Sequence, residues 1–165
     1  MARLRGNAEG TMDAKGRATV PTKFRGIFEG KDDLVLWEPQ GLDQPFLVLT
    51  SDEYFDAIYE REYALAEKER RQDLLHEVLG HMDDVELDAN ARFVVPEKYF
   101  GKAGFDKGGK LFFLANKTYV EIWSLPVWKM REAARRADRS LMDFTPDPVQ
   151  MAAARLPESG EPADE

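Results

Sequence analysis

The hydrophobic positions of this chain occur in short runs bounded by polar or turn-forming residues, a pattern typical of β-strands. Residues 3–12 alternate weakly and predict an edge strand. The other predicted strands lie at residues 18–20, 34–37, 46–49, 85–87, 92–95, 111–114 and 119–123. In each half of the chain the predicted order is strand, turn, strand, short helix, strand, strand.

Helical patterns separate and follow these strands. Thr50 stands three residues before Glu53, the spacing of a capping box, and predicts the start of a helix. Residues 61–79 are charged and favour helix, and their apolar side chains are expected to pack inward before Gly80 ends the segment. These side chains are Leu74, Leu75, Val78 and Leu79. A last helix is predicted at 127–143, where apolar residues recur at spacings of three and four.

One sequence motif occurs twice, at residues 13–24 and 88–99. In both copies an Asp is followed four residues later by an Arg, then by an apolar run, Pro, one polar residue, Lys and an aromatic residue. The copies are 75 residues apart, which exceeds the period of solenoid repeats and equals the size of a small half-domain. The chain is therefore interpreted as a duplication.

The first copy combines a tight turn with an ion pair. Lys15-Gly16 provides the residue that tolerates positive φ in a short loop. The carboxylate of Asp13 can accept hydrogen bonds from the guanidinium of Arg17, which would hold that side chain in one direction. Two interpretations follow: a salt bridge that only closes a hairpin, or an arginine held in one direction to meet a ligand.

The two copies resemble the paired Asp-x-x-x-Arg motifs of the MraZ family. They read Asp-Ala-Lys-Gly-Arg-Ala-Thr-Val-Pro at 13–21 and Asp-Ala-Asn-Ala-Arg-Phe-Val-Val-Pro at 88–96. The likeness extends from about Gly10 to the segment Glu121-Ile122-Trp123-Ser124. It implies an α+β fold of two tandem SpoVT/AbrB-like swapped-hairpin domains, joined and flanked by helices. The implied division is 7–54 for the first repeat, 55–82 for a helical linker, 83–126 for the second repeat, 127–143 for a C-terminal helix and 144–165 for a disordered acidic tail.

The same resemblance implies a bacterial transcriptional regulator that forms a ring-shaped homo-oligomer in the cytoplasm, associated with the nucleoid. It would bind double-stranded DNA at repeated boxes upstream of the division and cell-wall gene cluster. The residues expected to contact DNA are Arg3, Arg5, Lys15 and Arg17. Asp13, Asp88 and Arg92 are expected to be structural, because the second copy replaces Lys15 and Gly16 by Asn90 and Ala91 and has acidic residues at 83, 84 and 86.

The net charge of −8 argues against nucleic acid until its distribution is considered. Residues 1–31 contain seven Lys or Arg and three acids, whereas the last nine residues contain four acids and no base. The positive charge thus surrounds the first motif, and an oligomer would present it many times.

Several other classes are disfavoured. The chain has no cysteine, and His76 and His81 are five residues apart, which does not place them on one helix face, so neither metal nor cofactor is expected. No nucleophile and base pattern indicates an enzyme, and no apolar run is long enough to cross a membrane. The alternative kept from another class is an AbrB-like antitoxin or protein-interaction module, with the last helix and the acidic tail contacting a partner.

Overall fold

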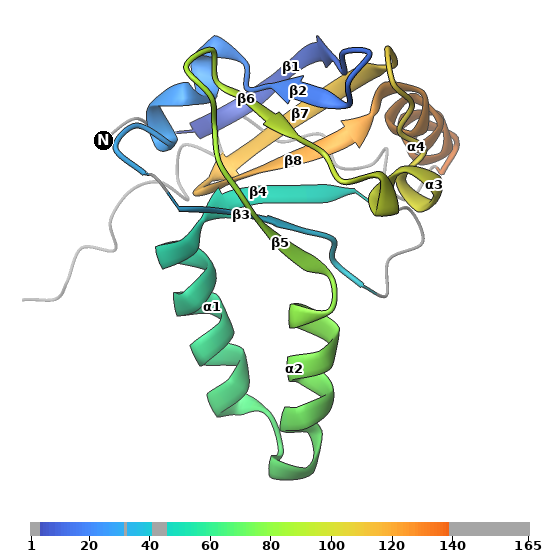
Figure 1. Ribbon diagram of the computed structural model, residues 1–165. Helices are drawn as coiled ribbons and strands as arrows, with labels where there is room; N and C mark the ends of the chain where they lie inside the picture. Colours follow the sequence, from blue (N-terminus) through green and yellow to red (C-terminus); the bar gives the residue numbers. More distant parts are fainter. Residues whose placement is uncertain (1–3, 32, 41–45, 139–165) are drawn as a thin grey trace, which may run out of the picture. The chain divides into compact units, whose positions relative to one another are not determined.

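Most of the regular structure is one antiparallel sheet with a small ribbon packed on it (Figure 1). The computed structural model describes residues 4–31, 33–40 and 46–138. The six strands of the sheet are, in spatial order, β1 (Leu4–Thr11), β7 (Lys110–Lys117), β8 (Tyr119–Ser124), β4 (Leu47–Ser51), β3 (Leu34–Trp37) and β5 (Met82–Val85). The ribbon pairs β2 (Arg17–Thr19) with β6 (Arg92–Val94). With several helices added, the fold is α+β, as predicted.

The strand pairs connect the two halves of the chain. β1 pairs with β7, β3 with β5, β4 with β8 and β2 with β6, and every pair is antiparallel. The strands β1 to β4 of the first half correspond in order to β5 to β8 of the second. When each strand is replaced by its counterpart, the same set of pairs results, so an approximate two-fold axis passes between β4 and β8 and between β2 and β6. The register agrees, since Leu47 pairs with Ile122 and Ala18 with Phe93, and the residues of each pair are 75 positions apart, the same offset as the two motif copies. The assignment of the halves to SpoVT/AbrB-like domains stays a prediction.

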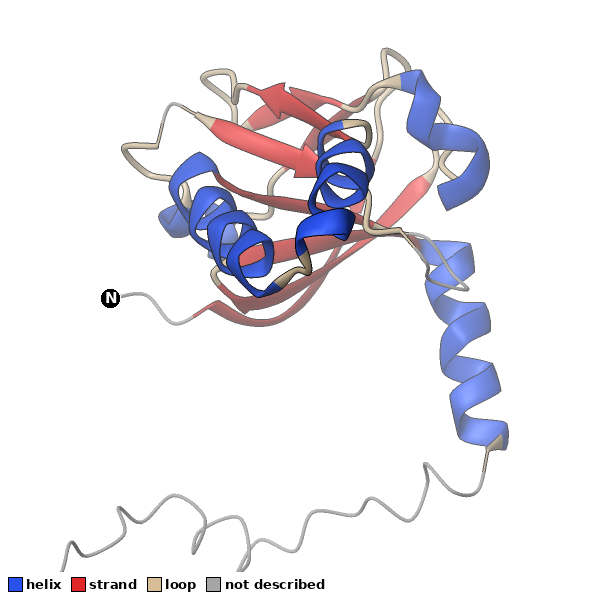
Figure 2. Ribbon diagram, turned by 90° about the horizontal axis from the view of Figure 1, so that it is seen from below, coloured by secondary structure: helices blue, strands red, loops and turns tan. Residues whose placement is uncertain are grey.

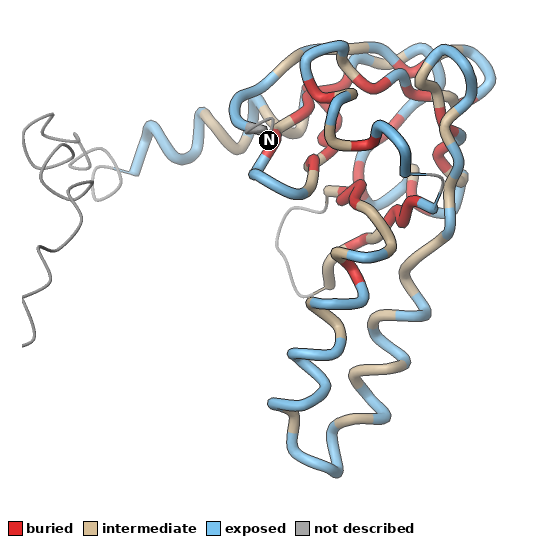
Figure 3. The backbone as a smooth tube through the Cα atoms, turned by 90° about the vertical axis from the view of Figure 1, so that its left-hand side faces the viewer, coloured by how far each residue is buried: buried red, intermediate tan, exposed pale blue. Residues whose placement is uncertain are grey.

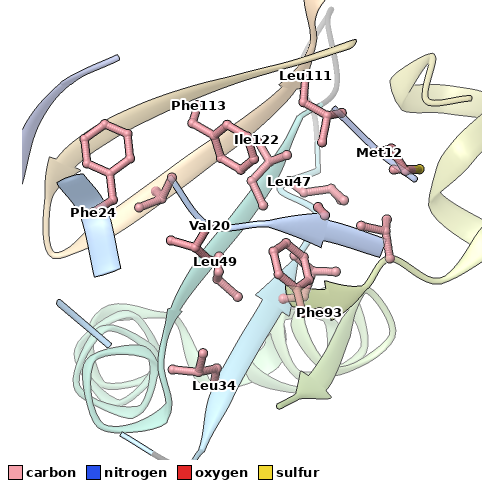
Figure 4. Close-up of a cluster of buried hydrophobic side chains, with 14 of the residues drawn as sticks. Met12, Val20, Phe24, Leu34, Leu47, Leu49, Phe93, Leu111, Phe113 and Ile122 are labelled. Carbon is pink, nitrogen blue, oxygen red and sulfur yellow. The ribbon is translucent and has the colours of Figure 1, made fainter. Parts of the chain in front are cut away.

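The main core lies between the large sheet and the β2–β6 ribbon (Figure 4). Its fully buried side chains include Met12, Phe24, Phe93 and Phe113, which come from both halves of the chain. Burial of an aromatic or aliphatic side chain contributes about 1.5–3 kcal/mol. The core therefore depends on both copies of the motif at once.

A second, smaller cluster lies around the start of the last helix, α4 (Leu125–Ala137). Trp128 stacks on Phe112 with ring centroids 4.4 Å apart and meets the edge of Trp123 at 5.3 Å. The chain divides into two units at Met130, inside α4, and the sheet with both clusters belongs to the first unit. The predicted helix 127–143 thus begins two residues earlier, and its part beyond Asp138 lies outside the described residues, as does the predicted tail.

Short helices follow each motif, as the proline after each strand predicts. They are the 3-10 helices η1 (Thr22–Ile27) and η3 (Glu97–Tyr99), the latter continued by α3 (Phe100–Ala103). Pro21 and Pro96 precede them with φ near −55° and −58°. None of the helices in the described part of the chain is long and apolar enough to cross a bilayer.

The predicted capping box is wrong by one residue. Ser51, not Thr50, caps α1 (Asp52–Leu65), and its hydroxyl accepts the N–H of Tyr54 at 3.2 Å. Thr50 still belongs to β4, and its hydroxyl donates to the carbonyl of Thr118 at 3.0 Å. The helix starts later because β4 keeps pairing with β3 up to Ser51.

The helix-favouring segment 61–79 does not form one helix. α1 ends at Leu65, a 3-10 turn η2 (Lys68–Arg70) follows, and α2 (Arg71–Leu79) returns beside α1. Figures 1 and 3 show these two helices side by side, and Figure 2 looks along them towards the sheet. We call α1, η2 and α2 the helical hairpin.

The prediction that the apolar residues of α2 pack inward is wrong for Leu79, which is 55% exposed. None of the residues of α2 is fully buried, and in α1 only Phe55 is (Figure 3). A mostly apolar cavity of about 360 Å³ lies where the helical hairpin meets β3, β4 and β8. The helices return beside each other instead of covering the sheet, which leaves their apolar side chains half-buried.

Candidate nucleic-acid interface

Both copies of the motif form the same turn. Asp13 Oδ1 accepts the N–H groups of Lys15 and Arg17, each at 2.9 Å. Asp88 Oδ1 accepts the equivalent N–H groups of Asn90 and Arg92 at 2.8 and 2.9 Å. These contacts join residues two and four positions apart, so the local sequence suffices to shape each turn. We call them the first loop (residues 13–17) and the second loop (residues 88–92).

Each loop also contains an ion pair between Asp and Arg. The Nε–H of Arg17 donates to Asp13 Oδ2 at 2.7 Å, and Arg92 donates to Asp88 at the same distance. The arginine side chains are 29% and 31% exposed. The pKa of Asp13 and of Asp88 is lowered, first by the backbone N–H of the arginine and further by its side chain. Geometry therefore does not distinguish the two arginines, and the division between a DNA-contacting Arg17 and a structural Arg92 stays a prediction.

The residue before each arginine has a left-handed backbone. Gly16 has φ 78° and Ala91 has φ 57°. Replacement of the turn glycine by alanine in the second copy therefore leaves the shape of the loop unchanged, although alanine is strained in this conformation.

The β2–β6 ribbon presents one face to the core and one outward. Ala18 and Phe93 are 0% and 2% exposed and face the core. Because side chains alternate along a strand, the residues on either side of them face outward. The outer face of the ribbon thus carries Arg17, Thr19, Arg92 and Val94. The two arginines are offset by about 7 Å along the ribbon.

A turn from the second half of the chain packs against the first loop. Met12 N–H donates to the carbonyl of Gly109 at 2.9 Å, and Gly108 N–H donates to that of Asp13 at 3.3 Å. This turn brings two exposed lysines that our sequence analysis missed. One is Lys110, which begins β7 and lies opposite Thr11 of β1. The other is Lys107, whose ammonium group pairs with the carboxylate of Glu97 at 2.8 Å. A charge count over residues 101–110, with three lysines and one aspartate, would have indicated them.

Acidic residues precede the second loop in the sequence. Asp83 and Asp84 lie on β5, which leads into that loop, and Glu86 follows them in an exposed position. Asp83 accepts from Lys98 at 2.7 Å and from the hydroxyl of Tyr99. The two ends of the ribbon therefore differ in charge although their backbones match.

The first copy has no equivalent of the Lys98–Asp83 pair, because Ala8 stands where Asp83 stands in the second. Lys23, the counterpart of Lys98, lies over the ring of Phe24 at 5.1 Å. It has no carboxylate partner among the described residues. An exposed and uncompensated cation thus follows the first strand of the ribbon.

The predicted contact residues do not all converge. Lys15 is exposed at the tip of the first loop, next to Arg17. Arg5 is exposed on β1 opposite Asn116, six residues from Thr11, which corresponds to about 20 Å along a strand. Arg3 lies outside the described residues. The structure brings together Lys15, Arg17, Lys107 and Lys110.

Within the described residues no group of three His, Cys, Asp or Glu side chains is arranged to hold a metal ion. His81 is close to the end of α2, where its Nδ1 lies 2.7 Å from the carbonyl oxygen of Glu77. His76 thus lies on α2 and His81 just after it, and neither belongs to the loops of the ribbon.

The chain matches no family model. It is similar over most of its length to several proteins named transcriptional regulator MraZ. That of Thermoanaerobacter pseudethanolicus is 32% identical over 126 residues, which cover 76% of this chain and 84% of the relative. That of Legionella pneumophila (strain Corby) is 28% identical over 145 residues, covering 85% and 92%, and that of Ruegeria sp. is 28% identical over 158 residues, covering 88% and 90%. Sequence similarity of this extent, together with the two Asp-x-x-x-Arg loops, places this chain in the MraZ family of transcriptional regulators.

Proposed function

We propose that this protein is a sequence-specific DNA-binding regulator that contacts DNA with the first loop and the outer face of the β2–β6 ribbon. The observation that carries this proposal is Arg17, which its ion pair with Asp13 holds on an exposed two-stranded ribbon. The major groove of B-DNA admits such a ribbon, and several known regulators read DNA this way. The names of the relatives agree with the proposal.

Arg17 suits direct recognition of a base. Its Nε is occupied by Asp13, and its two Nη nitrogens make no hydrogen bond within the described part of the chain. A guanidinium held in one direction loses less entropy when it forms the bidentate contact to guanine O6 and N7. In this proposal Lys15 and Lys110 contact phosphates, which would fix the position of the ribbon without reading sequence.

We also propose that the protein acts as a ring-shaped homo-oligomer on repeated boxes upstream of the division and cell-wall genes, in the cytoplasm and associated with the nucleoid. Leu65 and Leu79 on the helical hairpin are 75% and 55% exposed, and apolar side chains of this kind suit contacts between subunits. Several modules on one particle bind several boxes with an avidity that exceeds single-site affinity by ~10²–10⁴. This would reconcile the net charge of −8 with DNA binding.

The exchange of strands between the two halves supports the proposed kinship with SpoVT/AbrB-like swapped hairpins. In each half the first strand pairs with the third strand of the other half, as β1 does with β7 and β5 does with β3. A single chain would thus contain the pair of hairpins that a swapped-hairpin dimer assembles from two.

The test is selection of bound duplexes from a random library with the full-length protein, followed by titration of duplexes that carry one or several selected boxes. We expect one enriched sequence, steep salt dependence and much weaker binding to a single box. Lys15→Ala should weaken binding to all sequences about equally and reduce the salt slope by ~1. Failure to enrich any sequence would contradict the proposed function, whereas equal affinity for one box and for several would contradict the role of avidity.

A further inference from the structure

Val94 is an exposed hydrophobic side chain in the middle of the candidate interface. It is 58% exposed on the outer face of the ribbon. The other large hydrophobic side chains that are exposed in the described part of the chain lie elsewhere. Tyr63, Leu65 and Leu79 are on the helical hairpin, and Met130 is on α4. The core does not account for Val94, because its neighbour Phe93 already fills the inward position.

The register places Val94 directly beside Arg17. Val95 N–H donates to the carbonyl of Gly16 at 3.0 Å, and Val20 N–H donates to that of Ala91 at 2.8 Å. Hydrogen-bonded and non-hydrogen-bonded pairs alternate along an antiparallel ladder, so Arg17 and Val94 form a non-hydrogen-bonded pair. In such pairs the Cβ atoms are about 4.5–5.5 Å apart. Val94 and Arg17 thus come from opposite halves of the chain and point to the same side.

A valine in this place has a specific partner in the major groove. The base edges there present hydrogen-bonding groups, and the C5-methyl of thymine is the apolar feature among them. We propose that Val94 reads the C5-methyl group of a thymine adjacent to the base contacted by Arg17. This inference rests on the proposed function, and it makes the second half of the chain a source of specificity at the first loop.

The pseudosymmetric position provides a matched control. On the same face Thr19 stands beside Arg92, as Val94 stands beside Arg17. Thr19 is exposed and lies beside the arginine of the second loop instead of that of the first. Thr19→Ala removes a side chain from the same face of the ribbon, so it controls for a general loss of affinity, while the effect of the thymine methyl group should remain.

The experiment is a cycle between protein and DNA variants. Wild type, Val94→Ala and Thr19→Ala are titrated with the library-selected duplex and with versions in which each thymine in turn is replaced by deoxyuridine. For wild type and Thr19→Ala we expect one deoxyuridine position to weaken binding about fourfold, as expected for loss of one buried methyl group. Val94→Ala should bind the thymine duplex less tightly by a similar factor and should lose nothing more at that position.

Three results would overturn the inference: no position at which wild type senses the methyl group, the same loss from deoxyuridine in Val94→Ala as in wild type, or a loss that disappears in Thr19→Ala instead. A change of oligomer size in Val94→Ala with an unaltered methyl effect would assign Val94 to a contact between subunits. Val94→Ser, which has no γ-methyl group, replaces Val94→Ala if the latter melts early. If wild type selects no sequence at all, the proposed function itself fails, and this is seen before any deoxyuridine is used.

Discussion

The single residues Gly16 and Ala91 show how far local geometry persists when a side chain changes. Both have positive φ, and the hydrogen bonds around them agree within about 0.1 Å. A Cβ added at Gly16 would meet Phe100 at 3.5 Å, which is an ordinary contact. The difference between the two positions is therefore backbone strain rather than space.

Exchanging these residues should change stability in opposite directions. Gly16→Ala adds strain of about 1 kcal/mol and should lower the melting temperature by roughly 2–4 °C. Ala91→Gly removes that strain, partly offset by the larger entropy of the unfolded chain, and should raise the melting temperature by less. Both are measured by thermal denaturation at one protein concentration. A decrease in both variants would mean that the loops differ in some way other than strain.

The loop aspartates should make stability depend on acid. The pKa of Asp13 and of Asp88 is lower in the folded protein than in the unfolded chain, first because of the backbone N–H of the following arginine. Their stabilising contribution is thus fully present above the unfolded value of about 4 and is lost as pH falls through the lower folded value.

The double variant Asp13→Asn/Asp88→Asn should therefore show a flatter fall in the urea midpoint below pH about 4 than wild type does. Part of the fall should remain, because Lys31 and Lys107 lower the pKa of Glu53 and Glu97 in the same direction. Glu60→Gln, exposed on α1, is the control. Parallel curves for the double variant and wild type would show that the loops do not contribute to acid stability.

At the scale of elements, the helical hairpin differs from the sheet in how it is held. α2 has no fully buried residue, whereas β4 and β8 lie at the centre of the sheet with Leu47, Leu49 and Ile122 almost inaccessible. The hairpin depends on a row of aromatic contacts, from Trp37 and Phe55 to Tyr59 and Tyr63, next to the cavity. Elements with so little burial open at low free-energy cost.

Hydrogen exchange should reveal this difference. We expect the amides of α2 to exchange much faster than those of β8 in dilute protein, measured by mass spectrometry of peptides that cover each element. Protection of α2 that rises with protein concentration would indicate that other subunits cover the helical hairpin. Equal protection of α2 and β8 at the lowest concentration would contradict the expectation.

At the scale of the whole molecule, a nearly symmetric backbone carries an asymmetric charge. Lys15, Lys107 and Lys110 lie by the first loop, where Lys107 is paired with Glu97. Three acids, Asp83, Asp84 and Glu86, precede the second loop, whereas Glu9 is the one acid at the matching positions before the first. DNA phosphates are attracted by the first arrangement and repelled by the second. The charge distribution, and not the geometry of the ion pairs, therefore favours Arg17 over Arg92 as the DNA contact.

The comparison of Arg17→Ala with Arg92→Ala tests this asymmetry. Arg17→Ala should remove specific binding to a multi-box duplex, and Arg92→Ala should reduce it far less. Because both side chains are about one-third exposed and equally paired, both variants should lose similar and small amounts of stability. Titration and size-exclusion chromatography of the two variants measure these effects. Equal losses of affinity in two well-folded variants would show that both loops contact DNA.

The sequence by itself determined the two loops. Their hydrogen bonds and ion pairs join residues at most four positions apart, so the spacing of Asp13 and Arg17, repeated at Asp88 and Arg92, was enough to predict them. Most strands were predictable for the same reason, since alternation and turn residues are local signals. The strand predicted at 85–87 was not, because pairing with β3 places β5 at Met82–Val85. The end of β4 was not, because its pairing with β3 decides where α1 begins.

Only the tertiary structure decided which residues share the interface. The pairing of β1 with β7 brings Lys107 and Lys110 to the first loop and leaves Arg5 far from it, and the pairing of β2 with β6 places Val94 beside Arg17. A strand finds its partner by burying one face and satisfying its backbone hydrogen bonds against a segment tens of residues away. Those requirements are met by the assembled core, in which both halves of the chain participate, and no local pattern of residues encodes them.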